Sequence, residues 1–269
     1  MNKLRRAFAD LSVGQVHYAS AGPASAPAVL LLHQSPRSWR EYASVIPILA
    51  QRWRVIAMDT VGFGDSEDGG QPASIEHYAA VALELLTALE LDAAHVVGHH
   101  TGGVVAVEMA AQASARVKSL VLSSTPFVNQ AFRIARAERP PIDEVHIADS
   151  GEHLLQLWRA RQGFYPAGRT DLLQAFVRDA LAVSNAEDGH RAVAAYRMED
   201  RLGQIEQPVC IVKASADPFA APHAQEWLDL LPQAQLVEIA QGMVPLPDQL
   251  PQEFAAAVDH FLQGLDRPA

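Results

Sequence analysis

The feature that most constrains the fold of this chain is a glycine-rich turn that follows a β-branched run and precedes a helical pattern. Residues 96–103 read Val-Val-Gly-His-His-Thr-Gly-Gly, and apolar residues recur after them at helical spacing. The run predicts a short strand and the spacing predicts a helix, joined by a tight turn. Side chains at 98 and 102 would collide with neighbouring backbone in such a turn, which explains the glycines. The middle residue, His100, is then forced into a strained conformation with positive φ.

Continuous apolar runs alternate with helical patterns along most of the chain. Residues 29–32 and 54–58 are typical of buried strands, and residues 74–91 are typical of an amphipathic helix. Such alternation predicts a mostly parallel sheet with right-handed crossovers, here of about eight strands. Ser38 and Glu41 also predict a capping box at the start of a helix over 39–49.

The stretch 126–203 interrupts this alternation. It contains several helical patterns, rich in arginine, histidine and aromatic residues, with no strand run between them. We interpret it as a helical cap inserted over the strand ends. The predicted core then consists of residues 1–125 and 204–269.

Composition excludes several classes of partner. The 269 residues are 49% hydrophobic and 19% charged, with a net charge of −10 and no basic cluster beyond residues 3–6, so nucleic acid is not an expected partner. The single cysteine, Cys210, excludes an internal disulfide and a cysteine-rich metal site. No run approaches the roughly 18 apolar residues of a membrane span, and no apolar leader region follows the basic N-terminus. We expect a cytoplasmic protein that does not bind membranes, and the sequence leaves a homodimer open.

Several motifs, in their expected order, resemble those of the α/β-hydrolase fold superfamily over nearly the whole chain. His33-Gln34-Ser35-Pro36 resembles the family's His-Gly-x-Pro loop, and residues 59–66 resemble its Asp-x-x-Gly-x-Gly-x-Ser loop. Residues 98–103 resemble the nucleophile elbow, the turn at Asp217 resembles the one that supplies the acid, and residues 241–246 resemble the final histidine turn. The resemblance implies an α/β-hydrolase fold with an inserted cap.

Two positions depart from the family pattern. His100 stands in the slot of the nucleophile, and Met243 stands in the slot of the general-base histidine, whereas Asp217 keeps the acid slot. Ser-His-Asp acyl transfer therefore cannot operate, because both the attacking hydroxyl and the imidazole that takes its proton are missing. Gln34 also replaces the usual glycine, which narrows the loop.

We hypothesise a relocated His100/Asp217 dyad. Histidine is longer than serine, so its ring can reach the space left by the missing histidine and bond Asp217. An imidazole has a reference pKa of about 6.5 and can act as a general base near neutral pH. The resemblance implies that the backbone N–H groups of Gln34 and Thr101 form the oxyanion hole. The expected function is cofactor-independent hydrolysis of a small carbonyl, ester or lactone substrate by base-activated water.

Two alternatives remain open at this stage: a proton-transfer enzyme, such as an isomerase or lyase, on the same site, and a non-catalytic binder or receptor of small molecules. We expect no metal, because adjacent His99 and His100 point apart and zinc needs three or four convergent ligands. His99 is expected to be structural. The side chains expected to line the substrate pocket are His33, Ser35, Met243, Trp158, Tyr165 and Tyr196.

Overall fold

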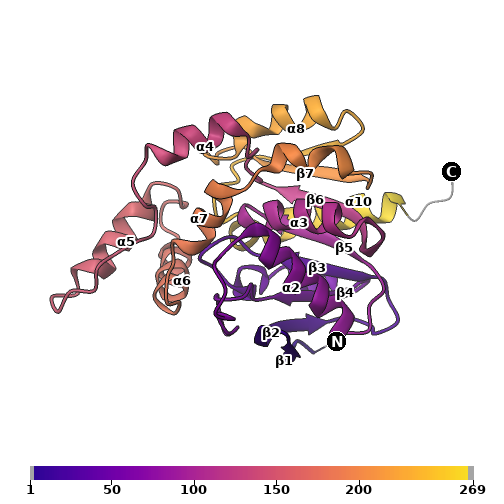
Figure 1. Cartoon of the computed structure of the whole chain (residues 1–269), viewed down its shortest axis with the longest axis horizontal. Coiled ribbons are helices and arrows are strands. Elements are labelled where there is room, and N and C mark those ends of the chain that lie inside the picture. Colours follow the sequence, from indigo (N-terminus) through magenta and orange to yellow (C-terminus); the bar gives the residue numbers. More distant parts are fainter. Residues whose placement is uncertain (1–2, 266–269) are drawn as a thin grey trace.

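One sheet runs through the centre of the protein (Figure 1), in a computed structural model that describes residues 3–265. Its strands are β1 (Arg5–Leu11), β2 (Gly14–Ala21), β3 (Ala28–Leu32), β4 (Arg54–Met58), β5 (Ala94–His99), β6 (Val117–Ser123), β7 (Val209–Ala214) and β8 (Gln235–Ile239). The eight strands are ordered β1-β2-β4-β3-β5-β6-β7-β8. β2 pairs antiparallel with β1 and β4, and the remaining pairs are parallel. The predicted, mostly parallel sheet is thus confirmed.

Helices cover both faces of the sheet. They are α1 (Ile46–Leu49), α2 (Ile75–Ala88), α3 (Thr101–Gln112), α4 (Gln130–Ala137), α5 (Glu152–Gln162), α6 (Thr170–Leu181), α7 (Asp188–Ala195), α8 (Ala224–Leu230), α9 (Leu246–Gln249) and α10 (Pro251–Leu265). Buried residues of α2, α3 and α8 share one hydrophobic cluster, whereas those of α1 and α10 belong to another. These two clusters lie on opposite faces, because successive strand residues point in opposite directions.

Strand β3 shows this alternation directly. Leu30 and Leu32 belong to the cluster under α2 and α3, whereas Val29 and Leu31 belong to the cluster under α1 and α10. All four side chains are buried. A strand covered on both faces reads as a continuous apolar run, which is why the sequence pattern located it.

The segment between β6 and β7 contains helices α4–α7 and, among the described residues, no strand. Figure 1 shows α5 and α6 projecting beyond the end of the sheet, while α4 lies near α8. Residues of α5 and α6 share a small hydrophobic cluster of their own, which includes Leu157, Leu173 and Phe176. We call this segment the cap; its predicted limits, 126 and 203, remain a prediction.

The predicted helix over 39–49 is interrupted. A 3₁₀ turn covers Trp39–Tyr42, and α1 begins only at Ile46, with a proline in its first turn. Proline lacks a backbone N–H and cannot continue a helix through its own position. Ser38 caps the 3₁₀ turn by accepting from the N–H of Arg40, but Glu41 turns away to the loop after β3 and completes no capping box.

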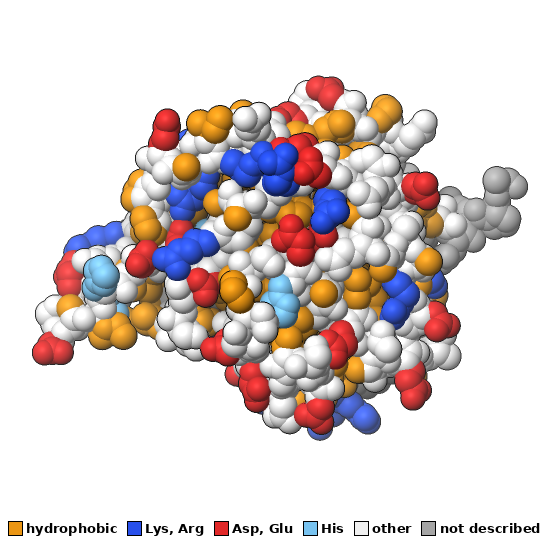
Figure 2. All heavy atoms as spheres, viewed as in Figure 1, with side chains coloured by type: hydrophobic (Ala, Val, Ile, Leu, Met, Phe, Trp, Pro, Cys, Tyr) orange, Lys and Arg blue, Asp and Glu red, His pale blue; other side chains and the backbone are white. Residues whose placement is uncertain are grey.

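The visible surface carries charges of both signs. Figure 2 shows acidic and basic side chains interspersed over this face. Within residues 3–265, none of the helices combines the length and apolar character that a membrane crossing requires.

Candidate active site

The turn between β5 and α3 places His100 at the centre of the candidate site. β5 ends at His99 and α3 begins at Thr101, and His100 between them has φ 47° and ψ −113°. Its N–H donates to the carbonyl of Ser123 on the adjacent strand, 2.9 Å away. A Cβ on Gly98 would lie 2.2 Å from the carbonyl oxygen of Gly102, and one on Gly102 would lie 2.0 Å from that of Leu32. The close backbone approach expected at both glycines is confirmed.

His100 and Asp217 meet directly. Nε2 of His100 lies 2.7 Å from Oδ2 of Asp217, within ion-pair distance, although the N–H direction falls short of a hydrogen-bond angle. Asp217 is fully buried, and its Oδ1 accepts the N–H groups of Phe219 and Ala220 at 2.9 and 3.2 Å. Burial by itself would raise the pKa of Asp217, but the adjacent His100 ring and these bonds lower it to about 2. The carboxylate is therefore ionised beside the ring.

The other ring nitrogen of His100 faces open space. Nδ1 bonds no group among the described residues, and it is not one of the fully buried polar atoms, whereas Nε2 is. His100 lines a cavity that we call the larger cavity, to distinguish it from a smaller one beside Tyr78. The dyad thus places one nitrogen beside a carboxylate and leaves the other unbonded, on a residue that lines the cavity.

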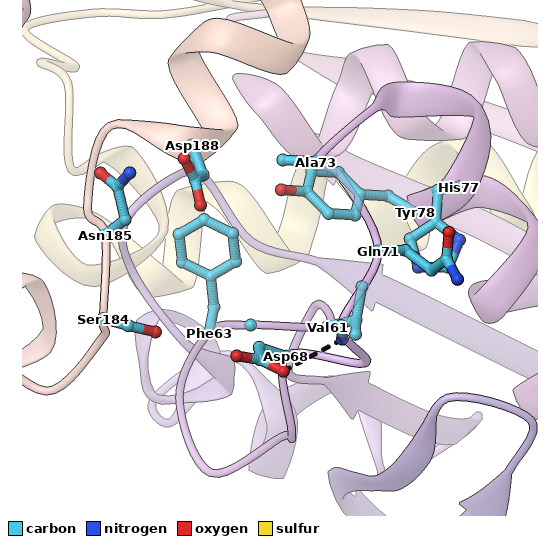
Figure 3. Close-up of a pocket in the computed structure, with 12 residues that line it drawn as sticks. Val61, Phe63, Asp68, Gln71, Ala73, His77, Tyr78, Ser184, Asn185 and Asp188 are labelled. Carbon is cyan, nitrogen blue, oxygen red and sulfur yellow. Dashed lines mark hydrogen bonds between the residues drawn. The ribbon is translucent and has the colours of Figure 1, made fainter.

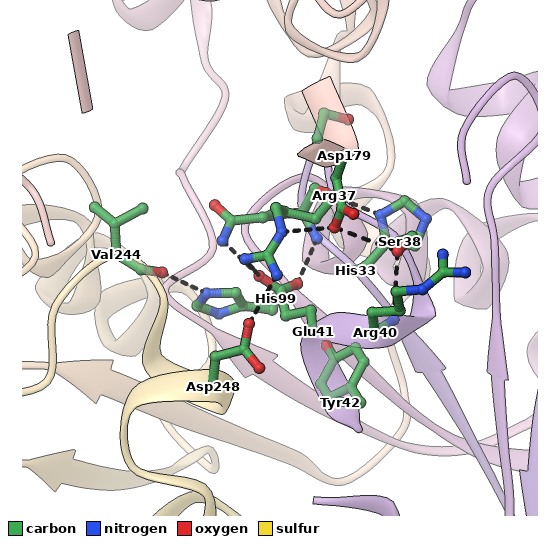
Figure 4. Close-up of polar contacts among 12 residues, drawn as sticks. His33, Arg37, Ser38, Arg40, Glu41, Tyr42, His99, Asp179, Val244 and Asp248 are labelled. Carbon is green, nitrogen blue, oxygen red and sulfur yellow. Dashed lines mark hydrogen bonds and ion pairs between the residues drawn. The ribbon is translucent and has the colours of Figure 1, made fainter. Parts of the chain in front are cut away.

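His99 has a structural environment, as expected. Its Nε2 lies 2.8 Å from the carbonyl of Val244 (Figure 4). Its Nδ1 lies 2.9 Å from the hydroxyl of Ser123. Burial, together with the adjacent His100 ring, lowers the pKa of His99 to about 3. A carbonyl only accepts, so Nε2 carries the proton and the neutral ring links β5, β6 and the loop after β8.

In the loop after β3, the backbone N–H of Gln34 is not free to serve in the predicted oxyanion hole. The backbone N–H of Gln34 donates to Oε2 of Glu41 at 2.9 Å, and the Gln34 side chain donates to Oε1 at 2.5 Å. That N–H is therefore committed to a buried carboxylate. The next N–H along the chain, that of Ser35, points to Oγ1 of Thr101 at 3.4 Å. The Ser35 N–H is therefore directed at the first residue of α3.

A buried ionic cluster supports this loop. Arg37 lies 2.7 Å from Asp248, 3.0 Å from Asp179 and 3.8 Å from Glu41 (Figure 4). Burial raises the pKa of Glu41 to about 7, although Arg37 and the Gln34 bonds oppose this rise. Glu41 was missed as a site residue because its spacing from Ser38 matched a helix cap.

The larger cavity, of about 690 Å³, lies between the elbow and the cap. The core contributes Gln34, Ser35, His100 and Thr101, and Val244 adds an apolar side chain. Apolar residues of the cap and of the loop after Asp217 form much of the remaining wall, among them Phe132, Phe164 and Phe219. The cap also contributes polar side chains: Arg136, Arg139, Arg161 and His190.

Most side chains expected in the pocket lie elsewhere. Of the predicted set, only Ser35 is among the described residues that line the cavity. Tyr196 is buried against α3, with its hydroxyl 2.6 Å from Glu108, and Tyr165 and Trp158 pack in the cap cluster. His33 is buried, and its Nε2 accepts the N–H of Thr60. In the loop after β8, Val244 lines the cavity and Met243 does not. Sequence spacing could not give the direction of these side chains.

A second cavity, of about 270 Å³, shares no lining residue with the first. Figure 3 shows the Tyr78 hydroxyl directed into it, opposite Asp188 and Asn185, with Phe63 beneath. It lies between the loop after β4, the start of α2 and the segment before α7. His100 is not among its described lining residues, and we assign it no part in the candidate chemistry.

One group of side chains within the described residues has the spacing of metal ligands. Potential ligand atoms of His17, Asp59 and Asp65 lie within 4.8 Å of one another. The Asp59 oxygens already accept the N–H groups of Trp39 and Asp65 and contact the His17 ring. The carboxylate is thus saturated by protein donors, and the arrangement fits a structural bond better than a metal centre.

Comparison with known proteins identifies the family. A model of the alpha/beta hydrolase fold matches residues 27–243. The chain is 41% identical to a soluble epoxide hydrolase of Corynebacterium sp. (strain C12) over 92 residues, which is 34% of this chain and 32% of that protein. It is 34% identical to haloalkane dehalogenase 2 of Mycobacterium bovis over 119 residues, or 44% of this chain and 41% of the relative.

The match to a solved structure extends over the whole fold. The enol-lactonase of Burkholderia xenovorans LB400 superimposes with a TM-score of 0.78 at 22% identity, over 96% of this chain and all of that one. The two sequence relatives, by contrast, are matched over less than half of their own lengths. The family model spans most of the chain, and the chain belongs to the alpha/beta hydrolase fold family.

Proposed function

We propose that this protein is a cofactor-independent hydrolase in which His100 activates water and Asp217 orients the ring. The observation that carries the proposal is the geometry of one imidazole: Nε2 lies 2.7 Å from the ionised Asp217, and Nδ1 is unbonded and not fully buried, on a residue that lines the larger cavity. A ring held in this way presents a basic nitrogen to a bound molecule.

The proposed reaction needs only water, the His100 ring and backbone N–H groups of the site. Nδ1 takes a proton from water while the hydroxide attacks the carbonyl carbon of an ester or lactone. The resulting oxyanion accepts the N–H of Thr101, which begins a helix whose first N–H groups have no intrahelical partner. Collapse breaks the bond to the alcohol oxygen, which takes the proton from the imidazolium. The free ring is restored.

The proposed substrate class is a small, largely apolar ester or lactone. The aromatic and aliphatic lining beside His100 supports an apolar body. The similarity to an enol-lactonase structure supports the fold alone, and the epoxide hydrolase match adds epoxides, whose ring carbons are electrophilic, to the esters and lactones worth assaying. Base-activated water could open each of these rings.

A panel of p-nitrophenyl esters, lactones and epoxides tests the proposal. We expect turnover by the wild type and a fall of about 10²–10⁴-fold in kcat for His100→Ala, because general-base catalysis contributes that much. His146→Ala, which changes an exposed cap histidine, is the matched control. Undiminished turnover by His100→Ala would remove this residue from its role.

A non-catalytic binder is the second candidate, favoured by one observation. The Gln34 N–H is bonded to Glu41, so the oxyanion donor implied by the family pattern is not available. A protein that keeps the cavity without this donor could bind a ligand and release it unchanged. Absence of turnover across the panel, together with saturable binding of the same compounds, would favour this function. The proton-transfer alternative would be revealed by exchange of substrate α-protons with deuterated water.

A further inference from the structure

We infer that the larger cavity binds a substrate that carries a carboxylate group, and that Arg161 of the cap receives it. This inference names the substrate class of the proposed hydrolase. It rests on the proposed function only where it says that the bound molecule is hydrolysed. Binding of the carboxylate does not require the chemistry of His100.

Arg161 is fixed in place with one nitrogen left free. Nε lies 2.9 Å from Oδ1 of Asp143, and Nη2 bonds the other carboxylate oxygen. The guanidinium also stacks on the ring of Phe176, 4.9 Å from its centroid. The Arg161 side chain is only 8% exposed, yet Nη1 bonds no described group and is not fully buried, and the residue lines the cavity. The free edge of a planar guanidinium is the shape that a carboxylate binds.

His190 provides a second polar atom beside Arg161. Its Nε2 lies 2.8 Å from Oδ2 of Asp143, so the same carboxylate contacts both Arg161 and His190. Burial by itself would raise the pKa of Asp143, but Arg161 and His190 lower it, and Asp143 therefore stays ionised as their common acceptor. Asp143 is not among the described cavity-lining residues. The carboxylate thus orients the two donors without occupying the cavity.

The charges that line the cavity favour an anion over a cation. Arg136, Arg139 and Arg161 line it, whereas Glu226 is the only acidic residue among the described lining residues. Glu226 already accepts from His223 and Asn129. Arg139 has no ion pair among the described residues. A substrate with an ester near His100 and a carboxylate toward the cap would match this distribution.

Binding of two matched probes tests the inference. Hexanoate and hexanamide have the same chain, and only hexanoate is charged. Calorimetry should show hexanoate bound about tenfold or more tightly than hexanamide by the wild type, since a hydrogen bond to a charged group is worth that much. His146→Ala, at an exposed cap histidine, should bind hexanoate as the wild type does, and binding of this probe requires no turnover. Failure of the proposed reaction would therefore leave this measurement intact.

Three variants locate the preference. Arg161→Gln should lose the discrimination between the two probes, whereas Arg159→Gln, a change at an exposed arginine of the same helix, should keep it. If Arg161→Gln is poorly folded because Asp143 loses its partner, Arg161→Gln combined with Asp143→Asn removes both charges and should also lose the discrimination. Equal binding of both probes by the wild type, or an unchanged preference in a folded Arg161 variant, would overturn the inference.

Discussion

Arg37 in the loop after β3 is joined to Asp179 in cap helix α6, with Nε 3.0 Å from Oδ2 and both side chains almost fully buried. The same guanidinium reaches Asp248 of α9. One side chain therefore connects the sheet, the cap and the C-terminal helices through charges that water does not screen. Loss of one partner from such a buried pair leaves an uncompensated charge.

Arg37→Met is expected to destabilise the protein by about 3–5 kcal/mol, the usual effect of breaking a buried ion pair. Urea unfolding monitored by tryptophan fluorescence measures the change. Arg40→Met is the matched control, because Arg40 pairs with Asp65 at the surface and such exposed pairs contribute about 0–1 kcal/mol. Similar losses in the two variants would contradict the importance of burial.

The fold could be predicted from the sequence where burial and periodicity act together. The apolar run in β3 lies under helices on both faces, and a Cβ on Gly98 or Gly102 would overlap neighbouring backbone. The apolar run and the two glycines can therefore each be recognised within a short stretch of sequence. The pocket could not be predicted in this way. Tyr165 and Tyr196 have the aromatic character of ligand-binding residues, but the packing of the cap turns both into hydrophobic clusters.

The candidate site was also predicted only in part, because the sequence does not give the direction of each side chain. The expected proximity of His100 and Asp217 follows from the family's elbow and acid slots, after β5 and β7 at one edge of the sheet, and the structure has these two side chains in contact. The role of Glu41 depends on where its side chain turns, since the same spacing from Ser38 suits both a helix cap and a bond to Gln34. Only tertiary structure decides between these.

The buried Glu41 carboxyl should make stability depend on pH. Its pKa is raised from 4.5 to about 7, so folding favours the protonated form, and stability is lost as pH rises through this window. The shift corresponds to about 3 kcal/mol. Between pH 4.5 and 8, Glu41→Gln should therefore gain about that much relative to the wild type. Parallel stability curves for the two proteins, measured by urea titration, would contradict the prediction.

Asp217 should have the opposite dependence. Its pKa is lowered from 3.8 to about 2, so its stabilising contribution is present above pH 3.8 and is lost as pH falls toward 2. The shift corresponds to about 2 kcal/mol. The stability advantage of wild type over Asp217→Asn should shrink by this amount between pH 5 and 2. Acid titration followed by circular dichroism provides the measurement, and a constant difference would show that folding does not change the pKa of Asp217.

Two glycines provide contrasting tests of backbone approach. Gly98→Ala should prevent folding or destabilise severely, because its Cβ would overlap the carbonyl of Gly102. Gly264→Ala should stabilise by about 0.5–1 kcal/mol, because this helical position has open space around it. Thermal melts of both variants are sufficient. A stable Gly98→Ala variant would refute the described elbow.

Restoring the family's side chains tests whether the scaffold still supports acyl transfer. Position 243 follows Gly242, whose carbonyl accepts the N–H of Ala216 at 2.8 Å, so the two loops that would supply histidine and aspartate are adjacent. His100→Ser combined with Met243→His should therefore acquire esterase activity with a burst of acyl-enzyme formation. Each single variant is a control. A silent double variant would indicate that the Gln34–Glu41 bond closes the oxyanion hole.

The separate hydrophobic cluster of the cap has a consequence for how molecules enter. Leu157, Leu173 and Phe176 pack with each other and not with the clusters on the two faces of the sheet. Opening of this unit would leave the cores of the sheet intact, although it would break the Arg37–Asp179 pair, and local unfolding of this kind costs less than global unfolding. Amide hydrogens of α5 and α6 should then exchange with solvent sooner than those of β3 and β5. The rate at which α5 and α6 open, rather than diffusion, would then limit the rate at which a ligand reaches His100.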